Sequence, residues 1–194
     1  VASTNLGSLN LTSVNLTAIR SGSTTGSPTL PSGWYLRSGY LLGPSANLAG
    51  INLSGANFSG VTGLTQIDMT GANLSNANFS NASLTNFTLT GANLAGTNLT
   101  GATLTGVISG SITGTPSALP PGWTLLSGFL IGPGANLSNQ NLASLNLASA
   151  VLTGANLANA TLDNANLGSA DLTAANLSGA SVQSANLTGA KLSK

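Results

Sequence analysis

Several residue types on which enzyme sites depend are missing from this chain of 194 residues. It contains no cysteine, no histidine and no glutamate, and charged residues make up only 4% of it. Without cysteine there are no disulfides and no thiolate metal sites. Without histidine the usual base of a nucleophilic triad is absent, and three aspartates cannot supply a cluster of metal ligands. We therefore expect no enzyme, no cofactor and no bound metal ion.

Charge and long apolar runs are also scarce. The formal net charge is only +1, whereas a nucleic-acid partner calls for clustered Lys and Arg that neutralise phosphates. No apolar run approaches the ~20 residues that a membrane-spanning helix needs. We therefore expect neither a nucleic-acid partner nor a membrane span.

Leucine, or an apolar residue in its place, recurs at every fifth position in three runs. There are 27 such positions: Leu6, Leu11, Leu16; Leu48, Leu53, Phe58, Leu64, Met69, Leu74, Phe79, Leu84, Leu89, Leu94, Leu99, Leu104; and every fifth residue from Leu137 to Leu192. A small residue, usually Ala, stands two positions before most of them, and Asn usually stands between. The period of five fits neither a helix nor a strand. It predicts a chain that turns a corner every five residues, with Leu and Ala inside, the other positions in water, and Gly, Asn or Ser near the corners.

The units read A-N-L-S-G, A-D-L-T-A and A-N-L-T-G, and in this the chain resembles the pentapeptide-repeat family. The resemblance implies an all-β fold, a right-handed quadrilateral β-helix with four units, or 20 residues, in each coil. Some members of that family target DNA gyrase through a strongly acidic surface that imitates DNA. With three acidic residues, this chain does not resemble that subgroup.

Coils of 20 residues make the register testable. The step from Phe58 to Leu64 is six residues, which predicts one extra residue there. Phe58, Phe79 and Leu99 should then stack in one column inside the coil. Asp171 and Lys191, 20 residues apart, should form a surface ion pair.

Two segments, residues 26–44 and 114–133, interrupt the repeat and are copies of each other. Both contain L-P-x-G-W and a later S-G-aromatic-L, and equivalent residues are 89 positions apart. We interpret residues 1–194 as a single solenoid of two tandem units of about 89 residues with extra C-terminal repeats. Each interruption reads as a Pro-bounded turn and a short hairpin whose aromatic residues pack on the solenoid. The alternative is an aromatic interaction patch, with the candidates Trp34, Tyr35, Tyr40, Trp123 and Phe129.

Three functions remain open. The first is a self-associating structural protein, such as an extracellular or cell-surface filament subunit that binds itself end to end. The net charge of this chain is low, so charge repulsion opposes association only weakly. Its repeats also continue nearly to both termini without capping units. The second is ice binding through stacked threonines, in the columns Thr65, Thr85, Thr105 and Thr70, Thr90. The third is a protein-interaction scaffold.

Overall fold

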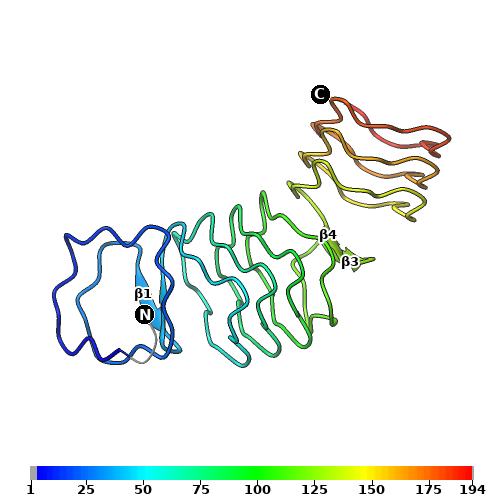
Figure 1. Cartoon of the computed structure of the whole chain (residues 1–194). Helices are drawn as coiled ribbons and strands as arrows, with labels where there is room; N and C mark the ends of the chain where they lie inside the picture. Colours follow the sequence, from blue (N-terminus) through cyan, green and yellow to red (C-terminus); the bar gives the residue numbers. More distant parts are fainter. Residues whose placement is uncertain (1–3, 194) are drawn as a thin grey trace.

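The computed structural model describes residues 4–193, which wind into successive four-sided coils (Figure 1). Isolated parallel bridges join each side to the same side of the next coil, mostly between residues 20 apart, as in Asn136 to Asn156 and Asn156 to Asn176. Four such positions occur in each full coil, at Asn136, Asn141, Asn146 and Val151. The fold is therefore the β-helix that the five-residue period predicts.

The corners explain which residues follow each leucine. The second residue after it takes a left-handed backbone conformation, with φ of 57° at Asn76 and 69° at Gly91. Gly adopts this conformation without steric cost and Asn tolerates it better than most residues. The chain accordingly places Gly, Asn or Ser at most of these corners.

The core consists of the leucine and alanine columns. Phe58 and Phe79 are fully buried and their ring centroids lie 4.8 Å apart. Around them the bridges join residues 21 apart, as in Asn57 to Asn78, so the extra residue before Leu64 is accommodated there. The backbone N–H of Phe79 donates to the carbonyl of Asn98, which places Leu99 next in the column. The predicted register is confirmed.

The sequence alone suggested that the asparagine before a leucine only faces water. In the structure its side chain also forms hydrogen bonds within and between coils. Its Oδ1 accepts the backbone N–H two residues later, for example from Ala158 to Asn156 at 3.1 Å. Its Nδ2 donates to the asparagine one coil earlier, for example from Asn156 to Asn136 at 3.3 Å. Asparagine therefore both closes a turn and links neighbouring coils.

Two antiparallel hairpins occupy the interruptions. Strand β1 (Tyr35–Arg37) pairs with β2 (Tyr40–Leu42), and β3 (Thr124–Leu126) pairs with β4 (Phe129–Ile131). Both turns are Ser-Gly with positive φ at each residue, as in a type I′ hairpin. A buried serine ties each hairpin to the preceding coil, because Ser21 Oγ accepts the N–H of Leu41 and Ser109 Oγ accepts that of Leu130.

The second hairpin lies where two hydrophobic clusters meet. Leu130 ends the first cluster, which begins at Leu42, and Ile131 begins the second, which continues to Leu172. Trp123 packs against both clusters. In Figure 1 the coils that follow β4 are displaced to one side of those before β3. No helix in residues 4–193 is long and apolar enough to cross a membrane.

Candidate functional site

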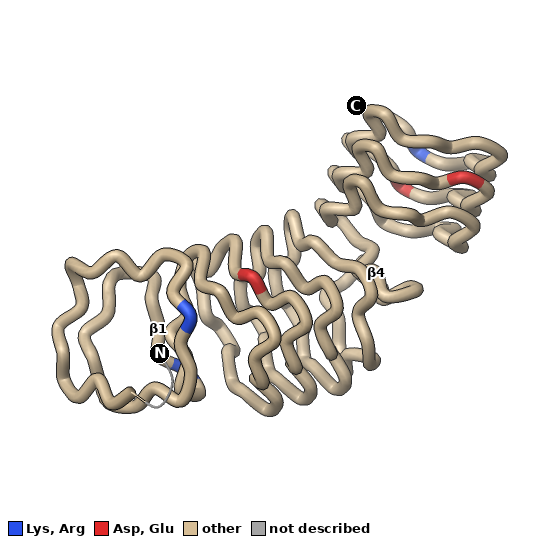
Figure 2. The backbone as a smooth tube through the Cα atoms, in the orientation of Figure 1, with Lys and Arg blue, Asp and Glu red and all other residues tan. Residues whose placement is uncertain are grey.

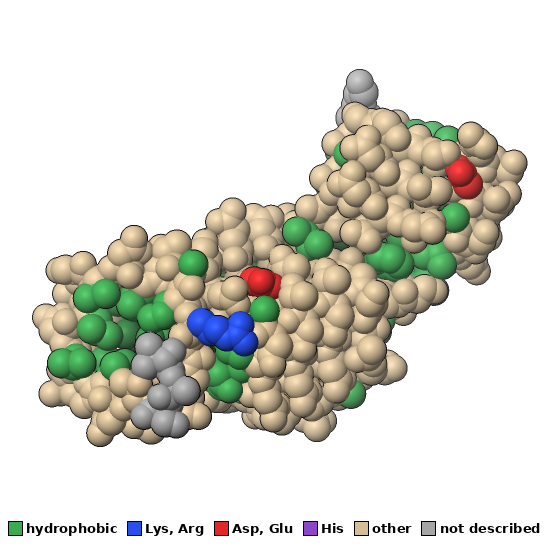
Figure 3. Space-filling model, viewed as in Figure 1, with side chains coloured by type: hydrophobic (Ala, Val, Ile, Leu, Met, Phe, Trp, Pro, Cys, Tyr) green, Lys and Arg blue, Asp and Glu red, His purple; other side chains and the backbone are tan. Residues whose placement is uncertain are grey.

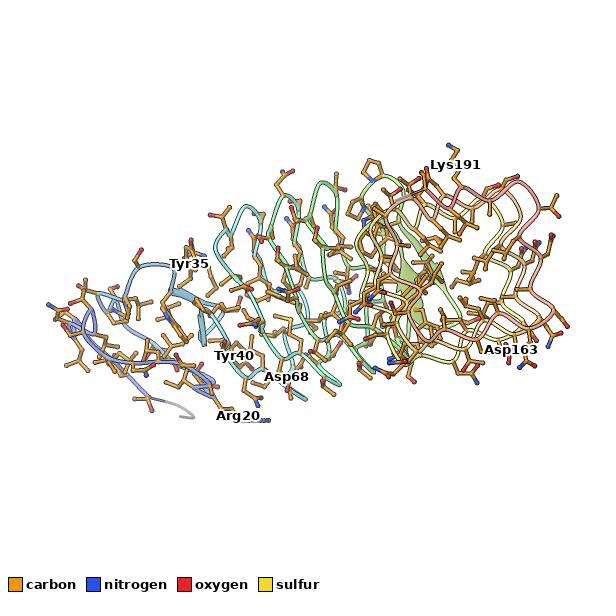
Figure 4. All side chains as sticks on the ribbon, turned by 90° about the horizontal axis from the view of Figure 1, so that it is seen from above. Arg20, Tyr35, Tyr40, Asp68, Asp163 and Lys191 are labelled. Carbon is orange, nitrogen blue, oxygen red and sulfur yellow. The ribbon has the colours of Figure 1, made fainter. Side chains whose placement is uncertain are left out.

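The charged positions are spread along residues 4–193 (Figure 2), and Asp163 and Lys191 lie on different sides of the C-terminal coils (Figure 4). Among residues 4–193, no group of three His, Cys, Asp or Glu is placed to hold a metal ion. Asp171 accepts the backbone N–H of Thr173 at 3.0 Å, and Lys191 Nζ lies 3.7 Å from its Oδ2, which confirms the predicted pair. Hydrogen bonds from Thr173, followed by the charge of Lys191, lower the pKa of Asp171 below the usual value of an aspartate. Lys191 is 71% exposed, so the pair is a weak surface contact.

The threonine columns are short. Thr65 bridges to Thr85, but both side chains are half-buried, and the Thr85 hydroxyl lies 3.2 Å from that of Ser83. An ice-binding face needs a long row of hydroxyls that are free to hold water. No contact in this region favours that function, which stays a prediction.

Each hairpin is anchored by its tryptophan. Trp34 and Trp123 are half-buried, and each indole lies directly against a glycine of the same interruption, Gly43 and Gly132 respectively. A Cβ at either glycine would overlap the indole ring. The packing of each tryptophan therefore holds its hairpin against the coils, and only glycine leaves room for the indole ring at Gly43 and Gly132.

The two tyrosines of the first hairpin are also half-buried and hydrogen-bonded. The Tyr35 hydroxyl donates to the carbonyl of Thr62, and the Tyr40 hydroxyl donates to that of Asn52, both at 3.1 Å. Arg37 lies over the ring of Tyr35 at 5.8 Å from its centroid. Both tyrosines thus tie the first hairpin to the following coil.

The second hairpin differs at the same positions. Thr124 stands where Tyr35 does, and Phe129 where Tyr40 does. Beside Trp123 the structure has a cavity of about 250 Å³. Its lining includes Thr124, Leu126 and Ile131 from the hairpin, and residues 146–151 from the following coil.

Among residues 4–193, the first coil has an apolar interior. Hydrophobic side chains gather on this end of the molecule in Figure 3. A cavity of about 170 Å³ lies inside the first coil, lined by Thr4, Leu6, Leu11, Leu16, Ile19, Thr24 and Leu41. The Thr24 hydroxyl is buried there without a hydrogen-bond partner among residues 4–193.

The leucines of the last coil are less buried than those of the coil before it. Leu177 and Leu187 are half-buried, although their equivalents one coil earlier, Leu157 and Leu167, are fully buried. The large hydrophobic side chains that are exposed among residues 4–193 show the same distribution: Leu9, Val14, Val151, Val182 and Leu192. Four of them lie in the two terminal coils, and the fifth, Val151, lines the cavity beside Trp123.

The five aromatic residues predicted as an interaction site do not form one patch. Trp34, Tyr35 and Tyr40 belong to the first hairpin and pack against the first cluster. Phe129 packs against the second cluster, and Trp123 against both. Sequence reasoning missed the cavity beside Trp123 and Val151 on its rim. The signal available was the exchange of Tyr35 for Thr124 between the two copies.

A family model described as pentapeptide repeats matches residues 45–63, 64–108, 134–168 and 155–193, in eight copies. These ranges together cover more than half of the chain. No curated protein sequence matches it.

Similar solved structures include HetL, a pentapeptide repeat protein involved in heterocyst differentiation regulation from the cyanobacterium Nostoc. It is 26% identical, the match covers 98% of this chain and 88% of HetL, and the TM-score is 0.40. Rfr23 from the cyanobacterium Cyanothece is 26% identical over 75% of this chain and 90% of Rfr23, with a TM-score of 0.30. QnrB1, a plasmid-mediated fluoroquinolone resistance protein, is 16% identical over 100% of this chain and 84% of QnrB1, with a TM-score of 0.38.

Proposed function

This chain belongs to the pentapeptide-repeat family, and we propose that it is a non-enzymatic structural protein that joins copies of itself end to end. The observation that carries the proposal is that, among residues 4–193, the first and last coils have exposed apolar side chains and backbone N–H groups without a backbone acceptor. A location outside the cell, as expected for a filament subunit, stays a prediction.

The backbone groups at the two ends are complementary. Inside the stack, the N–H of Leu157 donates to Asn176 of the next coil, and the N–H of Asn156 donates to Ala135 of the previous one. In the last coil the N–H groups of Leu177 and Leu187 reach no backbone acceptor among residues 4–193. An unpaired edge of this kind is a template for another chain.

The first coil presents the matching edge. There the N–H of Asn10 reaches no backbone acceptor among the described residues. A second copy placed below it would continue the ladder in the pattern of the interior, with leucine N–H groups donating to asparagine carbonyls. This contact joins two different surfaces, so it repeats without closing and produces a filament.

The apolar side chains at the ends point to the same contact. Leu9 and Val14 occupy the small-residue position of the first coil and are exposed. Val182 and Leu192 occupy the leucine position of the last coil and are exposed too. Burying them against a second copy is favourable by roughly 25 cal/mol for each Å² of apolar surface removed from water. With a net charge of +1, long-range repulsion opposes this association only weakly.

The proposal is tested with one lysine in the first or the last coil. Val182 is 41% exposed and Leu9 is 54% exposed, so Val182→Lys and Leu9→Lys leave the interior of the coils intact. We expect each variant to abolish or shorten filaments in negative-stain micrographs and to lower the sedimenting mass in analytical ultracentrifugation. The matched control is Thr100→Lys, an exposed position in the middle of the stack, which should assemble normally.

Two results would overturn the proposal. The first is an unmodified protein that stays monomeric across a broad concentration range. The second is a Thr100→Lys variant that loses assembly as completely as Val182→Lys does. In either case the alternative function, a scaffold that binds other proteins, is better supported.

A further inference from the structure

We infer that the cavity beside Trp123 is a binding site for a tyrosine side chain of a partner polypeptide. This inference does not depend on end-to-end assembly, because it concerns the side of the molecule at β3 and β4. It rests on a comparison of the two hairpins within the same chain.

The first hairpin shows what fills the equivalent space. Tyr35 crosses from β1 to the following coil, where its hydroxyl donates to the Thr62 carbonyl at 3.1 Å. Residues 57–61 of that coil correspond to residues 146–150, which line the cavity in the second copy. The extra residue of the first copy follows them, so Thr62 and Val151 occupy neighbouring places without being strict equivalents. Thr124 replaces Tyr35 there, and its short side chain is exposed. The second copy thus has a cavity on the same side of its hairpin and lacks the tyrosine, with Leu147 and Ser149 in place of Phe58 and Gly60.

The walls of the empty site suit an aromatic ring. Trp123 and Val151 form apolar surface, and Leu126 replaces Arg37, which lies over the Tyr35 ring in the first copy. Aromatic rings stack favourably on such surfaces, and an indole is a favourable neighbour. Val151 is 38% exposed, which is unusual for a large apolar residue outside the terminal coils of this chain.

The site also offers a hydrogen-bond acceptor for a phenol. The carbonyl belongs to Val151, which lines the cavity, and it accepts no backbone hydrogen bond from any described residue. A tyrosine hydroxyl would donate to it as Tyr35 donates to Thr62. A phenylalanine ring would leave this bond unmade.

The size of the cavity favours a side chain over a free small molecule. Sites for free ligands enclose most of the ligand and usually measure roughly 300–1,000 Å³. At about 250 Å³, and open to solvent at Thr124 and Val151, this site holds one ring while the rest of the ligand stays outside. A tyrosine carried by a polypeptide meets this geometry.

The first experiment titrates N-acetyl-L-tyrosinamide into the full chain and follows binding by NMR. We expect one site with a dissociation constant of roughly 1 mM, since few atoms make contact. N-acetyl-L-phenylalaninamide should bind about tenfold more weakly, because it lacks one hydrogen bond. If p-cresol binds more tightly than the tyrosinamide, a free phenol is the ligand and the inference of a polypeptide partner is wrong.

Two exchanges between the hairpins test the site itself. Thr124→Tyr should fill the cavity, abolish binding and leave Tm equal or higher, because it copies the first hairpin. Tyr35→Thr should create a second site, so that two tyrosinamides bind instead of one. Val151→Arg, at the rim, should weaken binding at least tenfold without unfolding the chain. Undiminished binding by Thr124→Tyr and Val151→Arg, or a stoichiometry of one for Tyr35→Thr, would overturn the inference.

Discussion

At the residue scale, the asparagine of a repeat unit needs both a hydrogen-bond donor and an acceptor, although it lies on the outside of the coil. Asn156 donates through Nδ2 to Asn136, and its Oδ1 accepts from Ala158 and from Asn176. Only a carboxamide can do all of this. Aspartate replaces it at Asp171, whose bridge partners Val151 and Lys191 carry no carboxamide. An asparagine one coil earlier does not exclude aspartate, because Asp68 bridges to Asn47.

We predict that Asn156→Asp lowers the free energy of unfolding by about 1–2 kcal/mol at neutral pH. The carboxylate keeps the turn bond but loses the donor to Asn136 and places a negative oxygen against the Asn136 Oδ1. Chemical denaturation at pH 7 measures the cost, which should shrink at low pH, where the protonated acid donates again.

The control for this variant is Asn139→Asp. Asn139 is exposed at a corner with φ of 60°, a conformation that Asp also tolerates. Its stability should stay within about 0.5 kcal/mol of the unmodified chain. Equal losses in the two variants would show that the links between coils contribute nothing.

At the scale of elements, the hairpins differ from the coils in how they are held. A coil is held by bridges on both sides, whereas β3 and β4 pair as strands only with each other. They are held to the coils by the packing of Trp123 and by single hydrogen bonds such as that from Leu130 to Ser109. The close approach of Trp123 to Gly132 makes this a tight contact with little room for adjustment. Gly132 does not have a positive φ, so space, and not backbone conformation, requires glycine there.

We predict that Gly132→Ala destabilises the chain by about 1–3 kcal/mol, the usual cost of overpacking. The added methyl group displaces the indole, so the fluorescence of Trp123, measured with Trp34 replaced by Phe, should shift toward that of a more exposed tryptophan.

Gly22→Ala is the matched substitution. Gly22 also lacks a positive φ, and a Cβ there would only touch Tyr40 at 3.4 Å. Its melting temperature should hardly change. A Gly132→Ala variant as stable as Gly22→Ala would contradict the packing described for Trp123.

Patterns with a fixed period were predictable from the sequence, and contacts made by single side chains were not. The five-residue repeat was enough to place Phe58 on Phe79 and Asp171 beside Lys191, because stacking follows directly from counting. The cavity beside Trp123 depends on how a hairpin settles on a coil, and no period describes that. The asparagine bonds between coils were missed because polar residues facing outward look alike in a sequence.

At the scale of the whole molecule, two hydrophobic clusters share one joint. The clusters adjoin at Leu130 and Ile131, and Trp123 packs against both of them. Stability in a solenoid is approximately a sum of repeats and the interfaces between neighbours. The joint is therefore where the unfolding of one half separates most easily from that of the other.

We predict that Trp123→Ala lowers stability by roughly 2–4 kcal/mol and splits thermal unfolding into two transitions. Differential scanning calorimetry detects this as a van't Hoff enthalpy below the calorimetric enthalpy. Trp34→Ala, which packs against the first cluster only, should lower Tm but keep one transition. A single transition in both variants would mean that other contacts couple the halves.

The 20-residue bridge spacing has a consequence for how such a chain can vary in length. Inserting 20 residues adds one coil and lengthens the stack by about 4.8 Å. The four sides of the coils before and after the insertion remain aligned. An insertion of five residues instead rotates everything beyond it by a quarter turn. Duplication of whole coils between the two hairpins therefore changes the distance between them in fixed steps. The structure of the first and last coils stays the same.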